Sequence, residues 1–232
     1  MAERNATRYD TIDALRGVAI VWMTIYHFSF DLNHFGFIHQ DFYADRVWTW
    51  QRTCILSLFL FCAGLGQAVA LAQGQTWPRF WRRWAQVAGC ALLVTAGSWV
   101  MFPRSFIYFG VLHGIAVMLI IVRLTAGWGR WLWLAGALAI ASKLLAFDAL
   151  NGAAFNWIGW VSRLPVTEDY VPVFPWLGVM WWGVAAGQWL LRERREWVTR
   201  PAPKALSGLG RWSLTWYMLH QPVLIGTLML LR

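Results

Sequence analysis

The chain has few charged residues. Only 13% of its 232 residues are Asp, Glu, Lys or Arg, whereas 59% are hydrophobic. A soluble globular protein carries about 25% charged residues. This shortage excludes an ordinary soluble enzyme and indicates an integral membrane protein with little mass outside the bilayer. We therefore expect an all-α, polytopic transmembrane helical bundle that forms a single domain over residues 1–232.

Acidic residues are scarcer than basic ones: 11 Asp and Glu against 20 Lys and Arg give a formal net charge of +9. Such an excess can favour nucleic acid, but its distribution argues for a membrane orientation. With the N-terminus in the cytoplasm, fourteen basic residues fall in cytoplasmic segments, five fall outside, and Lys143 lies within a predicted helix. Lys and Arg gather on the cytoplasmic side of membrane proteins. We expect a multi-pass protein of the cell inner (plasma) membrane, with the lipid bilayer and not nucleic acid as its partner.

Common catalytic and metal-binding motifs are absent. The three cysteines, Cys54, Cys62 and Cys90, all lie in apolar segments, and their spacing matches no metal motif. We expect them to be buried thiols. There is no GxGxxG, P-loop, GxSxG or HExxH pattern. Nothing in the sequence supports a bound metal.

Long apolar runs are plentiful, and they predict seven transmembrane helices. A bilayer-spanning helix needs about 20 predominantly apolar residues. Because the basic residues place the N-terminus in the cytoplasm, an odd number of spans puts the C-terminus outside. The basic residues Arg79, Arg82 and Arg83 fall in a short Trp-rich stretch before the third helix. The expected helices cover residues 16–37, 53–73, 84–101, 106–123, 129–148, 172–191 and 212–231.

The first predicted helix carries ionisable residues where a membrane anchor would carry leucine. His27 falls near its middle, Asp31 follows one turn later, and His34 comes three residues after that. Offsets of 4 and 7 put all three on one helical face. Ionisable groups inside a membrane usually face a protein interior or a water-filled cavity. We expect His27 to act as a base or nucleophile, with Asp31 orienting its ring.

Two further histidines lie within predicted spans. His113 falls in the fourth helix and His220 in the seventh, so both reach mid-membrane or the outer half of the bilayer. Each is a catalytic candidate, and each can equally be a structural residue that forms a hydrogen bond across the bundle. Arg16, at the cytoplasmic end of the first helix, can likewise be a ligand-binding residue or only a determinant of topology.

Several stretches resemble known membrane acyltransferases. Asp13-Ala-Leu-Arg16-Gly17, followed after ten residues by His27, resembles the Arg-x10-His signature of the acyltransferase-3 family. Residues 26–36, 102–116, 169–179 and 209–226 more closely resemble bacterial members of the heparan-alpha-glucosaminide N-acetyltransferase catalytic-domain family. Together these stretches span most of the chain. The resemblance implies transfer of an acetyl or other acyl group from cytoplasmic acetyl-CoA or another acyl-CoA to an acceptor on the far side.

The resemblance also implies site residues. Arg16 and His27 match the acyltransferase-3 motif, and His34 and His39 are the candidates for the histidine that follows the first helix in the lysosomal enzyme. We expect the phosphates of coenzyme A to meet a basic cytoplasmic rim made of Arg16, Arg79, Arg82 and Arg83. The catalytic candidates are His27, Asp31, His113 and His220. Residues expected to hold a saccharide or similar small acceptor are Tyr108, Glu168, Asp169, Gln221, His34 and His39.

Two other functions compete with an acyltransferase. The four catalytic candidates could instead form the proton relay of a transporter or permease, or the chain could be a non-catalytic subunit of a membrane complex. Transporters more often show two halves with paired broken helices, and no such repeat is evident here. The Arg-to-His spacing and the basic rim favour the enzyme, and a second copy of the chain, as a homodimer, is a candidate partner.

Overall fold

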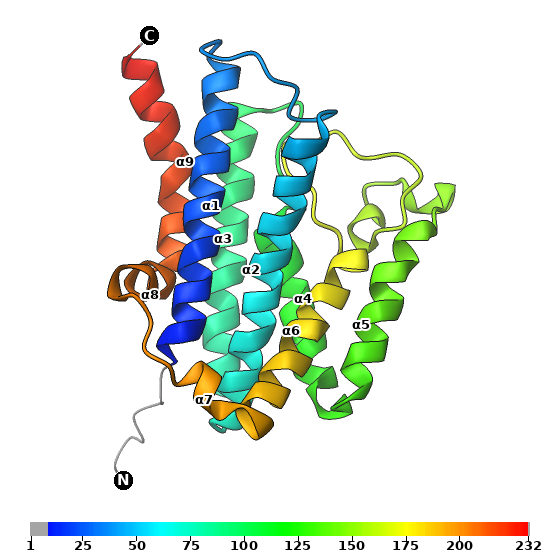
Figure 1. The fold of residues 1–232 in the computed structure, drawn as a ribbon. Coiled ribbons are helices and arrows are strands. Elements are labelled where there is room, and N and C mark those ends of the chain that lie inside the picture. Colours follow the sequence, from blue (N-terminus) through cyan, green and yellow to red (C-terminus); the bar gives the residue numbers. More distant parts are fainter. Residues whose placement is uncertain (1–8, 232) are drawn as a thin grey trace. The chain divides into compact units, whose positions relative to one another are not determined.

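The computed structural model describes residues 9–231, and its regular structure there is helical apart from two isolated β-bridges. This confirms the all-α class (Figure 1). The seven long helices are α1 (Asp10–His34), α2 (Arg46–Ala72), α3 (Trp77–Met101), α4 (Val111–Thr125), α5 (Trp131–Ala141), α6 (Val173–Glu193) and α9 (Ser213–Leu230). Between α6 and α9 lie α7 (Arg195–Val198) and α8 (Lys204–Arg211), and short 3-10 turns cover Ala126–Trp128, Ser142–Leu144, Asp148–Leu150 and Asn156–Ile158.

Several helix ends differ from the expected ones. Helix α3 begins seven residues early, because Thr76 is extended at its N-cap and Pro78 occupies the first turn. Arg79 therefore lies inside α3, together with Arg82 and Arg83. Helix α4 begins at Val111 and not at residue 106, because Phe109 accepts a hydrogen bond from Val171 N in an extended segment. Helix α5 ends at Ala141, so Lys143 falls in a 3-10 turn.

Three described helices are long and apolar enough to cross a bilayer: α2, α3, and α4 with its following turn, over Val111–Trp128. Helices α1, α6 and α9 contain 25, 21 and 18 residues, which is also near the length a span requires, but they carry more polar or tryptophan side chains. Arg4, Arg8 and Arg232, which contribute to the charge count behind the predicted topology, lie outside the described residues. That residues 1–232 form a single domain remains a prediction.

The described chain packs as two compact units. The terminal unit holds residues 9–59 and 196–231, and the central unit holds residues 60–195. Helix α2 passes from the first unit into the second after Phe59. Residues 9–59 and residues 196–231 therefore pack together around α1, whereas residues 60–195 pack separately.

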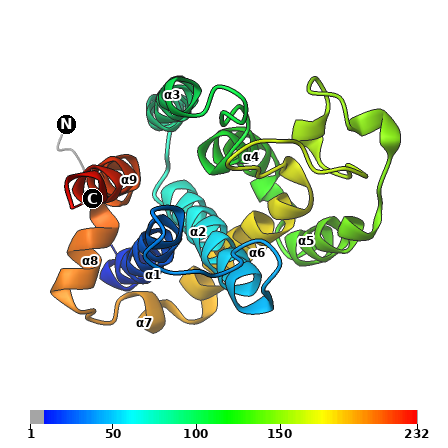
Figure 2. The same cartoon turned by 90° about the horizontal axis from the view of Figure 1, so that it is seen from above.

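The terminal unit is organised around α1, which packs against α8 and α9 (Figure 2). Its buried apolar core consists of Ile20, Met23, Tyr26, Phe42 and Ile55. Glycines let the backbones of α1 and α8 approach closely. A Cβ on Gly17 would overlap the Leu206 carbonyl oxygen, and a Cβ on Gly210 would overlap the Asp13 carbonyl oxygen. Small residues serve the same purpose at other membrane helix interfaces.

The central unit contains the second half of α2 and helices α3 to α6. Gly136 of α5 and Gly178 of α6 lie at the contact between those helices, where a side chain on either would meet the other backbone. Helix α3 is joined to α4 by the Trp84 indole, which donates to the Ala116 carbonyl at 2.9 Å. These contacts fix the positions of α4 and α6, which carry the loops described next.

The loops at one end of the central unit form an ordered cap, defined here as residues 102–110 and 148–172. Thr167 Oγ1 donates to the Phe106 carbonyl at 2.9 Å, and Val171 N donates to the Phe109 carbonyl at 3.1 Å. The Asp169 carboxylate accepts a hydrogen bond from Val111 N, in the first turn of α4, at 2.7 Å. An acidic group there satisfies a free amide and complements the helix dipole.

Candidate active site

Two of the predicted catalytic histidines meet in the terminal unit. His27 Nδ1 on α1 lies 3.1 Å from His220 Nε2 on α9, and the ring centroids are 5.0 Å apart. His220 is buried, with 7% of its surface exposed, and His27 is half-buried. Tyr26, beside His27 in the core, presents its ring edge to the imidazole at 5.8 Å. The packing of α1 against α9 thus brings together two residues separated by 193 positions.

The hydrogen bonds of this pair fix its tautomers when both rings are neutral. His220 Nδ1 lies 2.8 Å from the Tyr217 carbonyl oxygen, which only accepts, so the ring hydrogen is on Nδ1. His220 Nε2 is then an acceptor, and His27 Nδ1 must donate to it. His27 Nε2 consequently keeps its lone pair. A lone pair of this kind is what a general base or a nucleophile requires.

Asp31 lies one turn after His27 on α1, and Gln221 directly follows His220 on α9. Gln221 Nε2 donates to Asp31 Oδ1 at 3.3 Å. Asp31 has 3% of its surface exposed, and its Oδ2 atom has no hydrogen-bond partner within residues 9–231. Gln221 Oε1 is likewise buried without a partner there. The two side chains therefore present two unpaired acceptors close to the histidine pair, and it is His220, not Asp31, that lies against His27 Nδ1.

Arg16 lies near the start of α1, in a cluster of ion pairs. Its Nη1 atom is 2.9 Å from Asp13 Oδ1, and its side chain is 23% exposed. Arg211 of α8 approaches the other Asp13 oxygen at 3.8 Å and pairs with Asp10 at 2.6 Å. Arg16 precedes His27 by eleven residues, or roughly 16 Å along a helix. This cluster and the histidine pair thus occupy different levels of the terminal unit.

The other expected phosphate-binding arginines belong to the central unit. Arg79, Arg82 and Arg83 are exposed on the first turns of α3. Arg83 Nη1 donates to Gln86 Oε1 at 3.1 Å. Arg16 belongs to the terminal unit. That these four arginines bind one ligand therefore remains a prediction.

His113, in the central unit, has both ring nitrogens engaged. Thr95 Oγ1 donates its hydrogen to the Ile107 carbonyl at 2.8 Å, so His113 Nε2 must donate to Thr95 Oγ1 across 3.0 Å. His113 Nδ1 accepts from Gly110 N at 3.2 Å. These bonds join α3, α4 and the turn that precedes α4. This geometry favours the structural role for His113 over a catalytic one.

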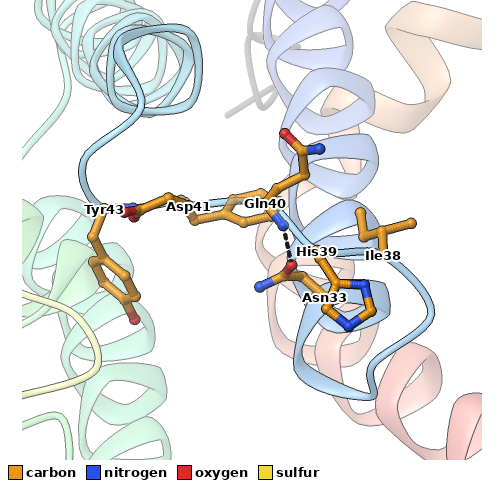
Figure 3. A pocket seen from close by; sticks show the side chains of 7 residues that line it. Asn33, Ile38, His39, Gln40, Asp41 and Tyr43 are labelled. Atoms are coloured by element: carbon orange, nitrogen blue, oxygen red, sulfur yellow. Dashed lines mark hydrogen bonds between the residues drawn. The ribbon is translucent and has the colours of Figure 1, made fainter.

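His34 and His39 are both exposed at the end of α1. His39 lines an open pocket of about 410 Å³ in the terminal unit, together with Asn33, Ile38, Gln40, Asp41, Phe42 and Tyr43. Figure 3 shows His39 beside Asn33 at one end of this segment and Tyr43 at the other. Asn33 Oδ1 holds the loop by accepting from Gln40 N at 2.6 Å, and buried Phe42 stacks on Trp48 at 4.1 Å. The pocket is thus polar at its rim and anchored in the apolar core.

Glu168 and Asp169, expected to bind a saccharide, are engaged inside the cap. Ser105 Oγ donates to Glu168 Oε1, and Asp169 caps α4 as described above. Tyr108, the other expected residue here, accepts a hydrogen bond from Asn156 Nδ2 at 2.7 Å. Burial raises the pKa of Tyr108, and burial followed by the neighbouring Tyr108 raises the pKa of Tyr170 to about 12. Both phenols are therefore protonated at neutral pH.

Sequence reasoning missed Asn156. It begins a short 3-10 turn, belongs to no motif, and becomes notable only because folding places it between Tyr108 and Tyr170. Its aromatic neighbours Phe155 and Trp157 are the one local signal, and aromatic residues are too common in this chain to single it out. Among residues 9–231, no three His, Cys, Asp or Glu side chains gather in an arrangement that could hold a metal ion.

Comparison with known proteins adds one finding. Residues 8–222 match the family model described as heparan-alpha-glucosaminide N-acetyltransferase, catalytic. The match includes His27, Asp31, His220 and Gln221, and it leaves out only the last ten residues and the first seven. No curated protein and no solved structure matches the chain.

Proposed function

Because the chain belongs to the heparan-alpha-glucosaminide N-acetyltransferase catalytic family, we propose that it moves an acetyl group from cytoplasmic acetyl-CoA to a saccharide-type acceptor at the outer face of the membrane. Membership makes the chain a membrane acetyltransferase, and the family uses acetyl-CoA. The acceptor, the path through the membrane and the roles of individual residues are our proposal.

The pairing of His27 with His220 is the observation that carries this proposal. His27 Nε2, with its free lone pair, takes a proton from the acceptor as the acceptor attacks the thioester carbonyl carbon. A bond forms between the acceptor and that carbon, the carbon–sulfur bond breaks, and the coenzyme A thiolate recovers the proton from His27. While His27 is cationic, His220 accepts its Nδ1 hydrogen bond and the Tyr217 carbonyl supports His220 in turn. In a variant of this scheme His27 first takes the acetyl group itself.

Asp31 and Gln221 support an acceptor that carries a primary amine. Their two unpaired oxygens, buried one helical turn from His27, need two hydrogen-bond donors. A neutral amine supplies two donors from one atom and keeps its lone pair for attack on the thioester. The family name itself refers to N-acetylation of a glucosaminide. We therefore assign the acceptor nitrogen to this pair.

Coenzyme A would enter at the cytoplasmic end of α1. Arg16 is partly exposed there, and a phosphate could compete with Asp13 for its guanidinium. The pantetheine arm would then follow α1 toward His27. Arg79, Arg82 and Arg83 extend the basic rim in our proposal, since they occupy the end of α3 that the predicted topology places in the cytoplasm.

This scheme needs seven spans: α1, α2, α3, α4, α5, α6 and α9, with the N-terminus in the cytoplasm of the inner membrane and the C-terminus outside. Three of these helices are apolar enough to qualify by composition alone. Of the remaining four, α1 and α9 carry the polar residues of the proposed site, α5 is shorter, and α6 is rich in tryptophan. Membrane proteins admit polar residues where they face protein or water. Helices α7 and α8 then lie on the cytoplasmic side, among basic residues.

The test is turnover of radiolabelled acetyl-CoA by the purified protein in detergent, with glucosamine as the acceptor. His27→Ala should reduce turnover at least a hundredfold, since general bases contribute about 10²–10⁴. His220→Ala should reduce kcat about tenfold or more with little change in KM for acetyl-CoA. Arg16→Ala should raise that KM.

His34→Ala is the matched control, because His34 lies on the same helix but is exposed. It should keep wild-type turnover. A wild-type protein that binds no acyl-CoA would contradict the acyltransferase mechanism proposed here and would favour the proton-relay transporter, in which the same His27–His220 contact would pass protons across the membrane.

A further inference from the structure

The cap of the central unit contains a small polar network that is separate from the histidine pair. Asn156 lies at its centre, with 2% of its surface exposed. Asn156 Nδ2 donates to the Tyr108 hydroxyl oxygen at 2.7 Å, and the Tyr170 hydroxyl donates to the Asn156 backbone carbonyl at 2.6 Å. Asn156 thus binds Tyr108 through its side chain and Tyr170 through its backbone carbonyl, which joins the two segments of the cap.

Counting hydrogens shows that this network is incomplete. The Asn156 Oδ1 atom is buried and has no partner within residues 9–231. Tyr108 uses its oxygen as an acceptor, so its own hydrogen remains to be donated, and no described residue accepts it. Buried polar groups in folded proteins nearly always have partners. One open acceptor and one open donor therefore lie on adjacent side chains.

The surroundings of this pair are aromatic and uncharged. Phe155 and Trp157, on either side of Asn156 in the chain, are 56% and 36% exposed. The Trp157 ring lies 6.0 Å from Phe109, and Phe106 lies edge-on to Tyr108 at 6.1 Å. Two acidic side chains of the cap, Glu168 and Asp169, are bonded to Ser105 Oγ and Val111 N. A few fixed polar groups among aromatic rings are typical of sites that bind small neutral ligands.

We propose that Asn156 and Tyr108 form a binding site for the hydroxyl groups of an uncharged part of a saccharide, with Phe155 and Trp157 offering their rings to its apolar face. A hydroxyl group both donates and accepts, so it matches the open Asn156 oxygen and the open Tyr108 hydrogen. The inference goes beyond the proposed function, because this saccharide site lies wholly in the central unit. It rests on the cap residues alone and makes no use of His27 or His220.

The experiment is a titration of the full-length protein in detergent, followed by tryptophan fluorescence, with glucosamine and with glucose. Glucose lacks the amine, so binding of both sugars reports on hydroxyl recognition. Asn156→Ala and Tyr108→Phe should each raise the dissociation constant for both sugars about tenfold, which corresponds to the loss of one hydrogen bond.

Tyr170→Phe is the matched control. It removes a hydrogen bond of the same network and leaves both open groups in place. It should bind both sugars like the wild type. Equal weakening in Tyr170→Phe would mean that the network only supports the fold, and unchanged binding in Asn156→Ala and Tyr108→Phe would mean that the open oxygen holds only an ordered water; either result overturns the proposal.

Hydrolysis of acetyl-CoA without an acceptor separates this proposal from the proposed function. Asn156→Ala should hydrolyse acetyl-CoA at the wild-type rate while its dissociation constant for glucose rises about tenfold. If the wild type binds sugars but turns over no acetyl-CoA, the proposed function fails and the saccharide site stands. If the wild type turns over acetyl-CoA but binds neither sugar, the saccharide site fails alone.

Discussion

At the scale of single residues, the five histidines of the chain divide by how many of their ring nitrogens the protein uses. His220 and His113 have both nitrogens occupied, whereas His27 keeps one lone pair free. His34 and His39 are exposed. A catalytic base needs a nitrogen that the fold leaves unbound, so this division favours His27 over His113 and His220.

His113 should therefore contribute to stability and not to catalysis. His113→Ala should lower the free energy of unfolding by about 1–3 kcal/mol, because Gly110 N and Thr95 Oγ1 lose their partner in a half-buried site. Turnover per folded molecule should stay at the wild-type level. Thermal unfolding in detergent, with acetyl-CoA turnover measured on the folded fraction, checks both parts. A large loss of turnover at unchanged stability would return His113 to the list of catalytic residues.

At the scale of elements, the contact of α1 with α8 depends on glycine. Gly17 and Gly210 lie where the two backbones touch, and neither has room for a side chain. Two acidic residues of α1, Asp10 and Asp13, pair with Arg211 at the end of α8. Close backbone packing at Gly17 and Gly210 thus holds α8 against α1. Ion pairs of Arg211 with Asp10 and Asp13 add to this contact at the end of α8, where Asp13 also pairs with Arg16.

Gly210→Ala should therefore destabilise the protein by about 1–3 kcal/mol, since the added methyl group forces α8 away from α1. Gly208→Ala is the control, because Gly208 lies on the same helix and a Cβ there meets nothing within 4 Å. It should leave stability unchanged or raise it by up to about 1 kcal/mol through helix propensity. Equal melting temperatures for the two variants would rule out a tight α1–α8 contact.

Because α8 borders Asp13, displacement of α8 should also disturb the pairing of Arg16. In the Gly210→Ala variant we expect KM for acetyl-CoA to rise along with the loss of stability, and in Gly208→Ala we expect neither change. Stability lost without any effect on KM would separate α8 from coenzyme A binding.

At the scale of the whole molecule, the described residues 9–59 and 196–231 share one packing unit, and residues 60–195 between them form the other. The proposed topology places the loop before α9 in the cytoplasm and the long loop after α5 outside. Gly208 and Gly152 lie in these two segments, and a side chain on either meets nothing within 4 Å. Both positions therefore accept a reporter without disturbing the fold.

Cysteine labelling tests this orientation. In a background in which Cys54, Cys62 and Cys90 are replaced by alanine, Gly152→Cys should react with a membrane-impermeant maleimide on intact spheroplasts. Gly208→Cys should react only after lysis. The opposite pattern would invert the topology, and reaction of both on intact spheroplasts would mean that the number of spans between them is even.

The sequence by itself determined the fold class and the family. Hydropathy adds up along a single segment, so apolar runs located all seven long helices before any contact was known. Helix ends were less predictable: Phe109 pairs with Val171, about sixty residues away, and this distant bond moves the start of α4. His27 also stood out locally, because an ionisable residue in an apolar helix is costly unless the protein uses it.

Only the tertiary structure decided which of the polar residues act together. His27 and His220 meet because α1 packs against α9 across 193 residues of sequence, and no spacing rule reaches that far. The expected acceptor residues Glu168 and Asp169 form bonds within the cap, while Asn156, without any motif, acquires an open oxygen there. Hydropathy and charge can be read from one segment of the sequence. Which nitrogen or oxygen atoms stay unpaired can be known only once the folded chain has formed its other hydrogen bonds.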